Sequence, residues 1–293
     1  MSLSDSILES YTENGRQYAN DDYHLPNDDA EETRLGILHQ AYLLLLGNQY
    51  TTARIPDNVE CILDIGTGPG DWALAVAERY PKAEVIATDI SAYLQPTNVP
   101  PNVVFQIDDA REEWTYKLPF DVIHIRGLTG AFPNWTHVYL QASKHLKPGG
   151  ILEVVDMDLI QTVEQSASSP IRIYNEAIQS ASQKAGTPIG LEHLRKELVE
   201  ASGLSVLRST TRDIPLGPDS PDPRMKSVGK MALVAALEGL EATALRLLTR
   251  ELSWKSEQVR DLCAQVAQEI VQPNCQASVR CQFVVARKLL ELE

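Results

Sequence analysis

The sequence lacks any hydrophobic run long enough to cross a membrane. A transmembrane helix needs roughly 18 or more consecutive apolar residues, and no stretch of this chain comes close to that length. The start of the chain, MSLSDSILESYTENGR, also lacks the basic flank and the apolar centre of a signal peptide. We therefore expect no membrane partner and a cytoplasmic location, with the nucleus as the alternative for a regulatory protein.

Cysteine is scarce, and its spacing argues against two kinds of site. The chain has four cysteines, with neither a CxxC pair nor a Cys/His ligand spacing among them. Four cysteines are too few for a disulfide framework in a chain of 293 residues. We expect reduced structural thiols and no metal site.

Positive charge is also in short supply. Lys and Arg together number 26 against 40 Asp and Glu, which gives a formal net charge of -14 and a pI near 4.9. Such a chain repels phosphate backbones and anionic membranes, and no basic stripe with interleaved aromatic residues offsets this. Nucleic acid is therefore excluded as an expected substrate. The 43% hydrophobic content is enough for the core of one large domain.

From residue 60 onward, short apolar segments alternate with amphipathic ones. This alternation is typical of βαβ units that build a parallel sheet. Strands are expected at 61–65, 84–90, 103–110, 120–127 and 151–158, and helices at 72–80 and 135–146, with the Lys-Pro-Gly-Gly segment 147–150 as a turn. The sequence therefore predicts an α/β, Rossmann-like fold.

The segments on either side of this pattern have a different character. Residues 1–26 are polar and contain three tyrosines, so we expect them to fold over another part of the chain without forming a core element. Helices are expected at 28–46 with Asn27 as N-cap, and at 171–185, 191–202, 225–244 and 256–271, and closing antiparallel strands at 204–214 and 281–289. No repeat or second core is evident. We expect a single domain over 1–293, with an N-terminal helical cap at 1–50, a cofactor-binding core at 58–158, and lid helices and closing strands at 159–293.

The segment GTGPGD, residues 66–71, follows the apolar strand CILDI. Glycines at this point allow a sharp turn and let a ligand lie against backbone amides. The spacing is GxGxG, with Asp71 where a dinucleotide-binding loop would carry its third glycine. Asp64 and Asp71 bring two carboxylates to the loop, which would disfavour a diphosphate. A ligand with an ammonium group and a sulfonium suits this loop better.

Two further acidic strand ends narrow the choice of ligand. Asp89 ends the second strand, where a carboxylate can accept hydrogen bonds from both hydroxyls of a ribose. Asp108 and Asp109 end the third strand, where a side chain can meet the exocyclic amine of an adenine. A nucleoside joined to an amino acid without phosphate has all these groups. The predicted cofactor is S-adenosyl-L-methionine.

With these motifs the sequence resembles the class I S-adenosylmethionine-dependent methyltransferases, and more closely the fungal LaeA-like and UMTA-type family. The resemblance is carried by DIGTGPG, TDIS and IDDA, by the distinctive YHLPNDDAEETRL at 23–35, and by FDVIHIRGLTG, HLKPGGILEVVDMD and the long segment 222–254. It implies a seven-stranded, mostly parallel sheet with an antiparallel last strand, a helical N-terminal segment and a helical lid. The chain departs from the family at 276–278, which reads Gln-Ala-Ser where the family often carries His-Ala-Tyr.

The motifs and the resemblance together define a set of candidate site residues. The expected cofactor-binding residues are Tyr23, Asp64, Gly66, Thr67, Gly68, Asp89, Ile90, Asp108, Asp109 and Arg126. The candidate catalytic residues are His24, His39, His124 and Arg126, because a hydroxyl of high pKa would need a general base.

Each candidate also has a purely structural interpretation. The three histidines could be buried and satisfied, Asp109 could be a solvated cap, and Arg126 could form an ion pair with Asp156 or Glu153. The tyrosines of the N-terminal segment could serve only in packing, although an aromatic face also suits a sulfonium. His137, His145 and His193 are interpreted as structural, the first and last of them on polar helix surfaces.

The predicted function is methyl transfer to a small-molecule secondary metabolite, first to oxygen and next to nitrogen or sulfur. One alternative is a regulatory methyltransferase that works in a protein complex, which would have a protein partner. Another is a cyclase that keeps the bound cofactor unchanged. The sequence leaves the oligomeric state open, including a homodimer.

Overall fold

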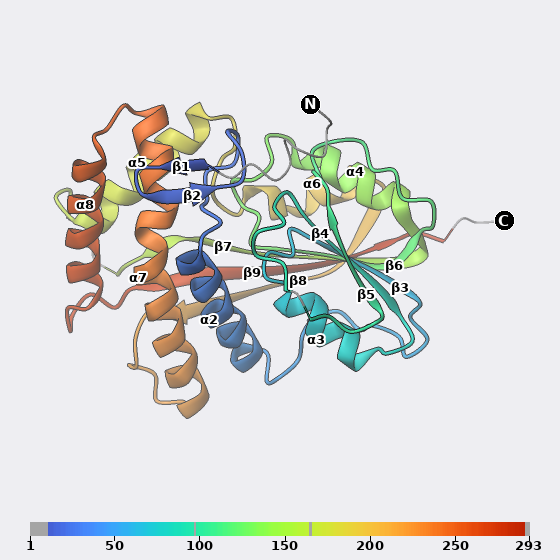
Figure 1. The fold of residues 1–293 in the computed structure, drawn as a ribbon. Helices are drawn as coiled ribbons and strands as arrows, with labels where there is room; N and C mark the ends of the chain where they lie inside the picture. Colours follow the sequence, from blue (N-terminus) through green and yellow to red (C-terminus); the bar gives the residue numbers. More distant parts are fainter. Residues whose placement is uncertain (1–10, 97, 164–165, 291–293) are drawn as a thin grey trace.

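A seven-stranded sheet forms the centre of the molecule in the computed structural model, which describes residues 11–96, 98–163 and 166–290 (Figure 1). The strand order is β5 (Val103–Ile107), β4 (Glu84–Asp89), β3 (Cys61–Ile65), β6 (Phe120–Arg126), β7 (Leu146–Gln161), β9 (Ser278–Lys288) and β8 (Leu204–Pro215). The first five strands in this order pair in parallel, and β9 runs antiparallel to both β7 and β8. This confirms the predicted fold class.

Helices cover the sheet and extend beyond it. They are α2 (Asp29–Leu45), α3 (Asp71–Arg79), α4 (Trp135–His145), α5 (Pro170–Lys184), the 3₁₀ turn η1 (Glu192–Leu194), α6 (Lys196–Glu200), α7 (Pro223–Glu251) and α8 (Ser256–Ile270). Figure 1 shows α2, α5, α7 and α8 gathered beside the β7 and β9 end of the sheet. Along the described residues, no helix combines the length and the apolar character that crossing a membrane requires.

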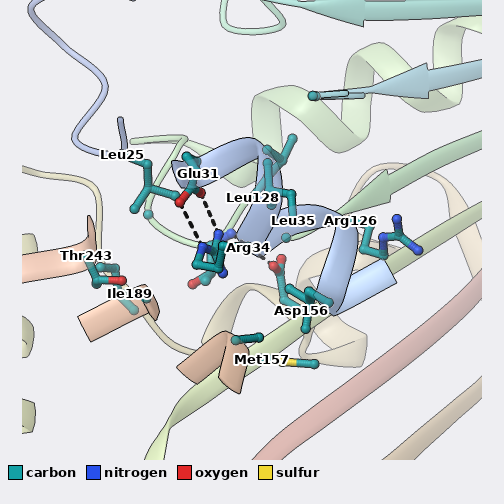
Figure 2. Close-up of a pocket in the computed structure, with 18 of the residues that line it drawn as sticks. Leu25, Glu31, Arg34, Leu35, Arg126, Leu128, Asp156, Met157, Ile189 and Thr243 are labelled. Atoms are coloured by element: carbon teal, nitrogen blue, oxygen red, sulfur yellow. Dashed lines mark hydrogen bonds and ion pairs between the residues drawn. The ribbon is translucent and has the colours of Figure 1, made fainter. Parts of the chain in front are cut away.

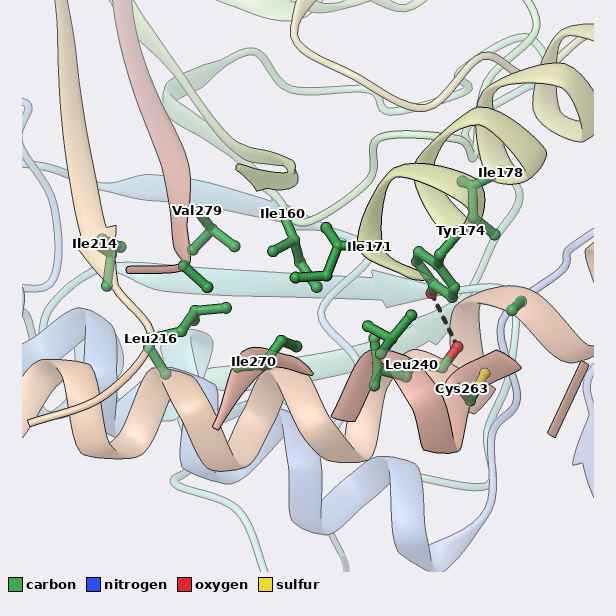
Figure 3. Close-up of a cluster of buried hydrophobic side chains, with 14 of the residues drawn as sticks. Ile160, Ile171, Tyr174, Ile178, Ile214, Leu216, Leu240, Cys263, Ile270 and Val279 are labelled. Atoms are coloured by element: carbon green, nitrogen blue, oxygen red, sulfur yellow. Dashed lines mark hydrogen bonds between the residues drawn. The ribbon is translucent and has the colours of Figure 1, made fainter. Parts of the chain in front are cut away.

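The largest apolar cluster joins these helices to the sheet. Buried side chains from α5, α7 and α8 meet the far ends of β7, β8 and β9, and Figure 3 shows Ile160, Ile171, Ile214 and Val279 among them. Tyr174 lies in the same cluster and donates a hydrogen bond to the carbonyl oxygen of Leu240 at 2.9 Å. The helices that follow β7 therefore share one continuous core with the sheet.

The first long helix begins one residue later than expected. Asp28 is the N-cap of α2, and its side chain accepts a hydrogen bond from the backbone N–H of Glu31 at 3.1 Å. The predicted cap, Asn27, is instead buried and donates to Ser91 Oγ at 2.8 Å. The prediction was wrong because a tertiary contact orients Asn27 away from the helix terminus, and the next residue can cap equally well.

The N-terminal segment contains structure that the sequence did not indicate, although residues 1–10 lie outside the described part. Tyr11–Glu13 (β1) and Arg16–Tyr18 (β2) pair as an antiparallel hairpin. Tyr18 is completely buried, so the expectation that this segment adds nothing to the core was wrong. The ring of Tyr18 lies 4.2 Å from the guanidinium carbon of Arg246 on α7, a contact that no local pattern predicts.

Several other boundaries differ from the expectation, and among them β5 ends at Ile107 instead of residue 110. β7 begins at Leu146, which pairs with Phe120, so the segment expected as a turn is the irregular start of the strand. The helix expected at 191–202 is divided into η1 and α6, because Arg195 between them has an extended backbone. α7 continues to Glu251, because its buried face continues through Leu245, Leu247 and Leu248.

Gly70 closes the glycine loop and caps α3 with a φ of 84°. A Cβ at this position would also lie 2.5 Å from the ring of Phe105. We predict that Gly70→Ala lowers the free energy of unfolding by about 3 kcal/mol, from backbone strain plus overlap. Gly127→Ala is the matched control, because Gly127 has a φ of 72° and open space around its missing Cβ, and should lower it by about 1–2 kcal/mol. Urea denaturation measures both, and equal losses would contradict the assigned overlap.

Candidate functional site

Two cavities lie at the carboxyl ends of the parallel strands and share part of their walls. The larger has a volume of about 320 Å³ and the smaller about 60 Å³. Tyr23, Gly66, Asp89, Ile90 and Leu128 line both. Every residue that the sequence predicted for the site lines one cavity or the other, including the three candidate histidines and Arg126. The expected convergence of strand ends is therefore present.

The carboxylate of Asp89 ties the glycine loop to the end of β4. Its Oδ2 accepts a hydrogen bond from the backbone N–H of Gly68 at 2.9 Å, and its Oδ1 accepts one from Ser91 N–H at 3.0 Å. Burial raises the pKa of Asp89, while these backbone donors act in the opposite direction. Thr67 N–H donates to the carbonyl oxygen of Thr88 on the same strand. The loop is thus fixed with its backbone facing the cavity.

Asp64 is held by two side chains. Its Oδ2 accepts from Thr67 Oγ1 at 2.7 Å, and its Oδ1 lies 2.7 Å from Nδ1 of His124. The His124 ring stacks on Trp72 with 3.7 Å between centroids and an interplanar angle of 4°. His124 is almost completely buried. The imidazole is therefore fixed in place between a carboxylate and an indole.

Arg126 ends β6 and points to α2. Its Nη2 lies 3.1 Å from Nδ1 of His39, and its guanidinium carbon lies 4.8 Å from the centre of the Tyr42 ring. Burial and the charge of Arg126 lower the pKa of His39 to about 4, so His39 is neutral at pH 7 and can accept this hydrogen bond. Asp71 also lines this cavity, and burial raises its pKa.

The proposed ion pair of Arg126 with Asp156 or Glu153 does not form. Glu153 binds the backbone N–H of Thr52 at 2.7 Å and the hydroxyls of Thr51 and Thr52. Asp156 accepts from the backbone N–H of Thr129 at 3.1 Å and lies 2.8 Å from Nε2 of His193. Within the described ranges no carboxylate is close enough to form an ion pair with Arg126.

The remaining histidines include one error of prediction. His193 was expected on a polar surface, but it is buried, pairs with Asp156 and stacks on Trp135 at 4.0 Å. The helix in which it was expected breaks beside it, so helical periodicity assigned it to the wrong face. His24 lines the larger cavity, its buried Nδ1 has no partner among the described residues, and burial lowers its pKa.

The two acidic residues after β5 differ in their partners. Asp108 accepts a hydrogen bond from the Tyr116 hydroxyl at 2.9 Å. Asp109 forms a bidentate pair with Arg111, with 2.6 Å between Oδ2 and Nη2. Arg111 also lies 3.5 Å from Asp22. Asp109 is therefore occupied by a guanidinium, whereas Tyr116 uses only one oxygen of Asp108, which lines the smaller cavity.

Sequence reasoning missed an ion pair in the wall of the larger cavity. Arg34 donates from Nε and Nη2 to the two carboxylate oxygens of Glu31, at 2.8 and 2.5 Å, and Glu31 is only 3% exposed. Figure 2 shows these side chains meeting among lining residues from α2, β7 and α7. Their spacing of three residues within YHLPNDDAEETRL was the available signal.

The site offers several kinds of polar group around one space. Carboxylates lie at the ends of β3, β4 and β5, and a guanidinium lies at the end of β6. The glycine loop contributes backbone atoms to the cavity wall. Carboxylates can accept from hydroxyl, amine and ammonium groups, and a guanidinium can donate to a carboxylate. The described part of the chain holds no group of three His, Cys, Asp or Glu side chains placed to bind a metal.

Comparison with known structures shows where the fold occurs elsewhere. A crystal structure of coclaurine N-methyltransferase bound to N-methylheliamine and S-adenosylhomocysteine aligns with a TM-score of 0.51 and 16% sequence identity. The alignment covers 92% of this chain and 78% of that chain. At this identity the likeness supports the methyltransferase fold alone.

Comparison with protein families and with known sequences shows the family as well as the fold. A model of the methyltransferase domain matches residues 38–208. Methyltransferase pytC of Aspergillus terreus is 30% identical over 98% of this chain and 90% of its own length. Secondary metabolism regulator LAE1 of Cochliobolus heterostrophus is 30% identical over 95% of each chain. The chain therefore belongs to the methyltransferase family and is an S-adenosylmethionine-dependent methyltransferase related to pytC and to the LaeA-type regulators.

Proposed function

We propose that this methyltransferase acts on an oxygen of a small, largely apolar molecule of secondary metabolism. The observation that carries the proposal is the extent of the larger cavity, which continues from the glycine loop to α7. The wall there is formed mainly by small and aliphatic side chains, namely Ala232, Ala235, Ala236, Leu240, Ile214 and Leu216. An apolar chamber next to a polar cofactor site is typical of small-molecule enzymes.

The chain would work as one methyltransferase unit. In this proposal residues 1–50 cap the site, 58–158 hold the cofactor, and 159–293 supply the lid helices and closing strands. The shared core of sheet and helices described above supports one unit, since neither part buries its apolar face alone.

The nucleoside part of the cofactor fits the smaller cavity and the wall that both cavities share. Asp89 would accept from the ribose hydroxyls, with Ile90 beside it. Asp108 would accept from the exocyclic amine of adenine, because it lines this cavity and Tyr116 uses only its Oδ2. Asp109 would contribute mainly by holding Arg111 at the rim.

The amino-acid part of the cofactor fits the larger cavity near the glycine loop. Asp64 and Asp71 would attract the ammonium group, and Arg126 would donate to the carboxylate, since that guanidinium has no carboxylate of its own among the described residues. Gly66, Thr67 and Gly68 would line the chain of the amino acid with backbone atoms.

When bound, S-adenosylmethionine supplies a methyl group on a positively charged sulfur. The protein's part is to align the acceptor oxygen with that carbon and to exclude water. The oxygen must also lose its proton, and the histidines offer weak help. Burial lowers the pKa of both His24 and His39, and Nδ1 of His124 is occupied by Asp64. We therefore expect an acidic acceptor, such as a phenol, an enol or a carboxylic acid.

The Glu31 and Arg34 pair would orient this acceptor. It is a polar group in a wall that also contains Leu25, Leu38 and Leu240. Glu31 uses one edge of the Arg34 guanidinium, through Nε and Nη2, and the remaining N–H groups can donate to a carbonyl or carboxylate of the substrate.

A second candidate function is regulatory. The related proteins LAE1 and laeA are named secondary metabolism regulators, and they match nearly the whole of this chain at 27–30% identity. A regulatory protein of this family would act through a protein complex. Affinity purification followed by mass spectrometry would favour this function if it returned a stoichiometric protein partner, and labelled methyl groups on that partner would strengthen it.

The test of the leading proposal is direct. Purified protein is incubated with methyl-labelled cofactor and a panel of phenols, enols and carboxylic acids of fungal metabolites, with matched amines and thiols. We expect label in an O-methyl product with equal release of S-adenosylhomocysteine. Label found in amines or thiols but in no oxygen acceptor would overturn the O-methylation proposal.

We predict that Asp89→Asn weakens binding of S-adenosylhomocysteine. The amide keeps the shape of the side chain but removes the charge that accepts from two hydroxyls, so Kd should rise by roughly ten- to a hundredfold. Asp57→Asn is the control, because it removes the same charge at an exposed position. Isothermal calorimetry measures both, and an unchanged Kd in Asp89→Asn would contradict the assignment.

We also predict a pH signature for His39. Its folded-state pKa of about 4 lies below an unfolded value of about 6.5, so the unfolded state binds the proton more readily. The stability that neutral His39 contributes is full above about pH 6.5 and is lost as pH falls toward 4.

The stability difference between the parent and His39→Gln should therefore depend on pH. It should be constant above pH 7 and decrease by up to about 1.4 kcal/mol per pH unit below pH 6.5. Denaturant unfolding at several pH values measures it. A difference that does not change with pH would show that His39 titrates normally.

A further inference from the structure

Arg246 is a buried cation that has no role in the proposed methyl transfer. It lies on α7 and its side chain is 0% exposed. Burial and the neighbouring Arg250 lower its pKa to about 10, so it is still charged at neutral pH. Burying a charge is strongly unfavourable unless it is paired and hydrogen-bonded. The partners of Arg246 therefore indicate what this position does.

Those partners all come from the N-terminal strap, which we define as residues 11–28. The guanidinium lies between two aromatic rings, 4.9 Å from the centre of Tyr11 and 4.2 Å from that of Tyr18. Its Nε lies 3.1 Å from Oε2 of Glu13. Figure 1 shows the β1–β2 hairpin lying against α7. One helix residue thus binds both strands of the hairpin.

Arg246 also binds the backbone that follows the hairpin. Its Nη1 donates to the carbonyl oxygens of Asn20 and Tyr23, at 2.6 and 2.7 Å. The side chain of Asn20 accepts in turn from the backbone N–H of Tyr23 at 2.9 Å. Both polar groups of the Tyr23 backbone are therefore held, one directly by Arg246 and one through Asn20.

Tyr23 stands where its position matters to the cofactor. It lines both cavities, and so marks the place where they meet. Beyond it the strap is tied down again, because Asn27 donates to Ser91 at 2.8 Å and Arg16 pairs with Asp28 at 2.6 Å. The strap thus crosses the cavities with Tyr23 between two fixed points.

We propose that Arg246 is a positioning residue for the cofactor, which holds Tyr23 across the junction of the two cavities through the carbonyl oxygens of Asn20 and Tyr23. The cofactor product leaves only after this part of the strap separates from α7. The inference rests on the proposed cofactor site, since Tyr23 must lie over the ligand for its position to matter.

The chain provides a matched control in Arg260. This residue on α8 donates to the carbonyl oxygen of Asn14 at 2.6 Å and pairs with Glu241. It therefore ties the turn of the same hairpin to the helices without touching residues 20–23. If Arg246 only held the hairpin, replacing Arg246 or Arg260 should change the dissociation rate of the cofactor product to a similar extent, apart from the effect of burial.

The experiment measures the dissociation rate of S-adenosylhomocysteine by stopped-flow displacement. We expect Arg246→Met to increase this rate about tenfold, and Arg260→Met less than about twofold. Hydrogen exchange of residues 20–24 should accelerate in Arg246→Met and stay unchanged in Arg260→Met. Tyr23→Ala should by itself release S-adenosylhomocysteine fast. Adding Arg246→Met to Tyr23→Ala should not increase the dissociation rate further.

A second variant covers the case in which Arg246→Met does not fold. Glu13→Gln removes the strap carboxylate that pairs with both Arg246 and Arg250 on α7, without opening a buried space, because Glu13 is 24% exposed. It should increase the dissociation rate by about three- to fivefold, and Asp57→Asn should leave it unchanged.

Two results would overturn the proposal. One is equal dissociation rates in the parent, Arg246→Met and Glu13→Gln. The other is a fast rate in Arg246→Met that increases further on a Tyr23→Ala background, which would mean that Arg246 acts through another group. Either result leaves the cofactor site intact if Asp89→Asn weakens binding, whereas normal binding by Asp89→Asn and Tyr23→Ala would remove the site itself.

Discussion

Carboxylates at the ends of neighbouring parallel strands are the constraint on which this site depends. Parallel strands bring their carboxyl ends to one edge, so Asp64, Asp89 and Asp108 stand close together where water is partly excluded. Each like charge raises the free energy of the others unless donors balance it. The chain supplies those donors locally, through the amides of Gly68 and Ser91 for Asp89 and a histidine and a threonine for Asp64.

These local donors decide what ligand the edge can accept. The loop amides that a diphosphate would need are partly used, since Gly68 donates to Asp89. The carboxylates present oxygen atoms to the cavity, which suits hydroxyl, amine and ammonium groups. The hydrogen bonds of the loop therefore favour the same kind of ligand that the sequence predicted, which is a nucleoside joined to an amino acid without phosphate.

A second level of organisation comes from segments far apart in the chain. Arg246 and Tyr23 are separated by 223 positions in the sequence. Two hydrogen bonds nevertheless join Arg246 to the strap, one to the carbonyl oxygen of Asn20 and one to that of Tyr23. α2 adds Glu31, Arg34 and His39 to the same cavity. In the proposed site the sheet edge holds the cofactor, and the segments before and after the central strands line the rest of the larger cavity.

The parts predicted from the sequence are those that depend on local pattern. Strand periodicity predicted the sheet. The glycine spacing and the acidic residues at the strand ends predicted which residues lie around its edge. The hairpin, the position of His193 and the buried contact of Asn27 depend on distant partners, namely Arg246, Asp156 and Ser91. No window of neighbouring residues contains that information. The pairing of Glu31 with Arg34 could be predicted from their spacing, but its place in a cavity wall could not.

The most direct measurement is a crystal structure with S-adenosylhomocysteine bound. We expect both ribose hydroxyls within hydrogen-bond distance of the Asp89 carboxylate, adenine beside Asp108, and Tyr23 over the junction of the cavities. A nucleoside bound with its ribose away from Asp89, or with the strap displaced from α7 while the ligand is in place, would contradict it.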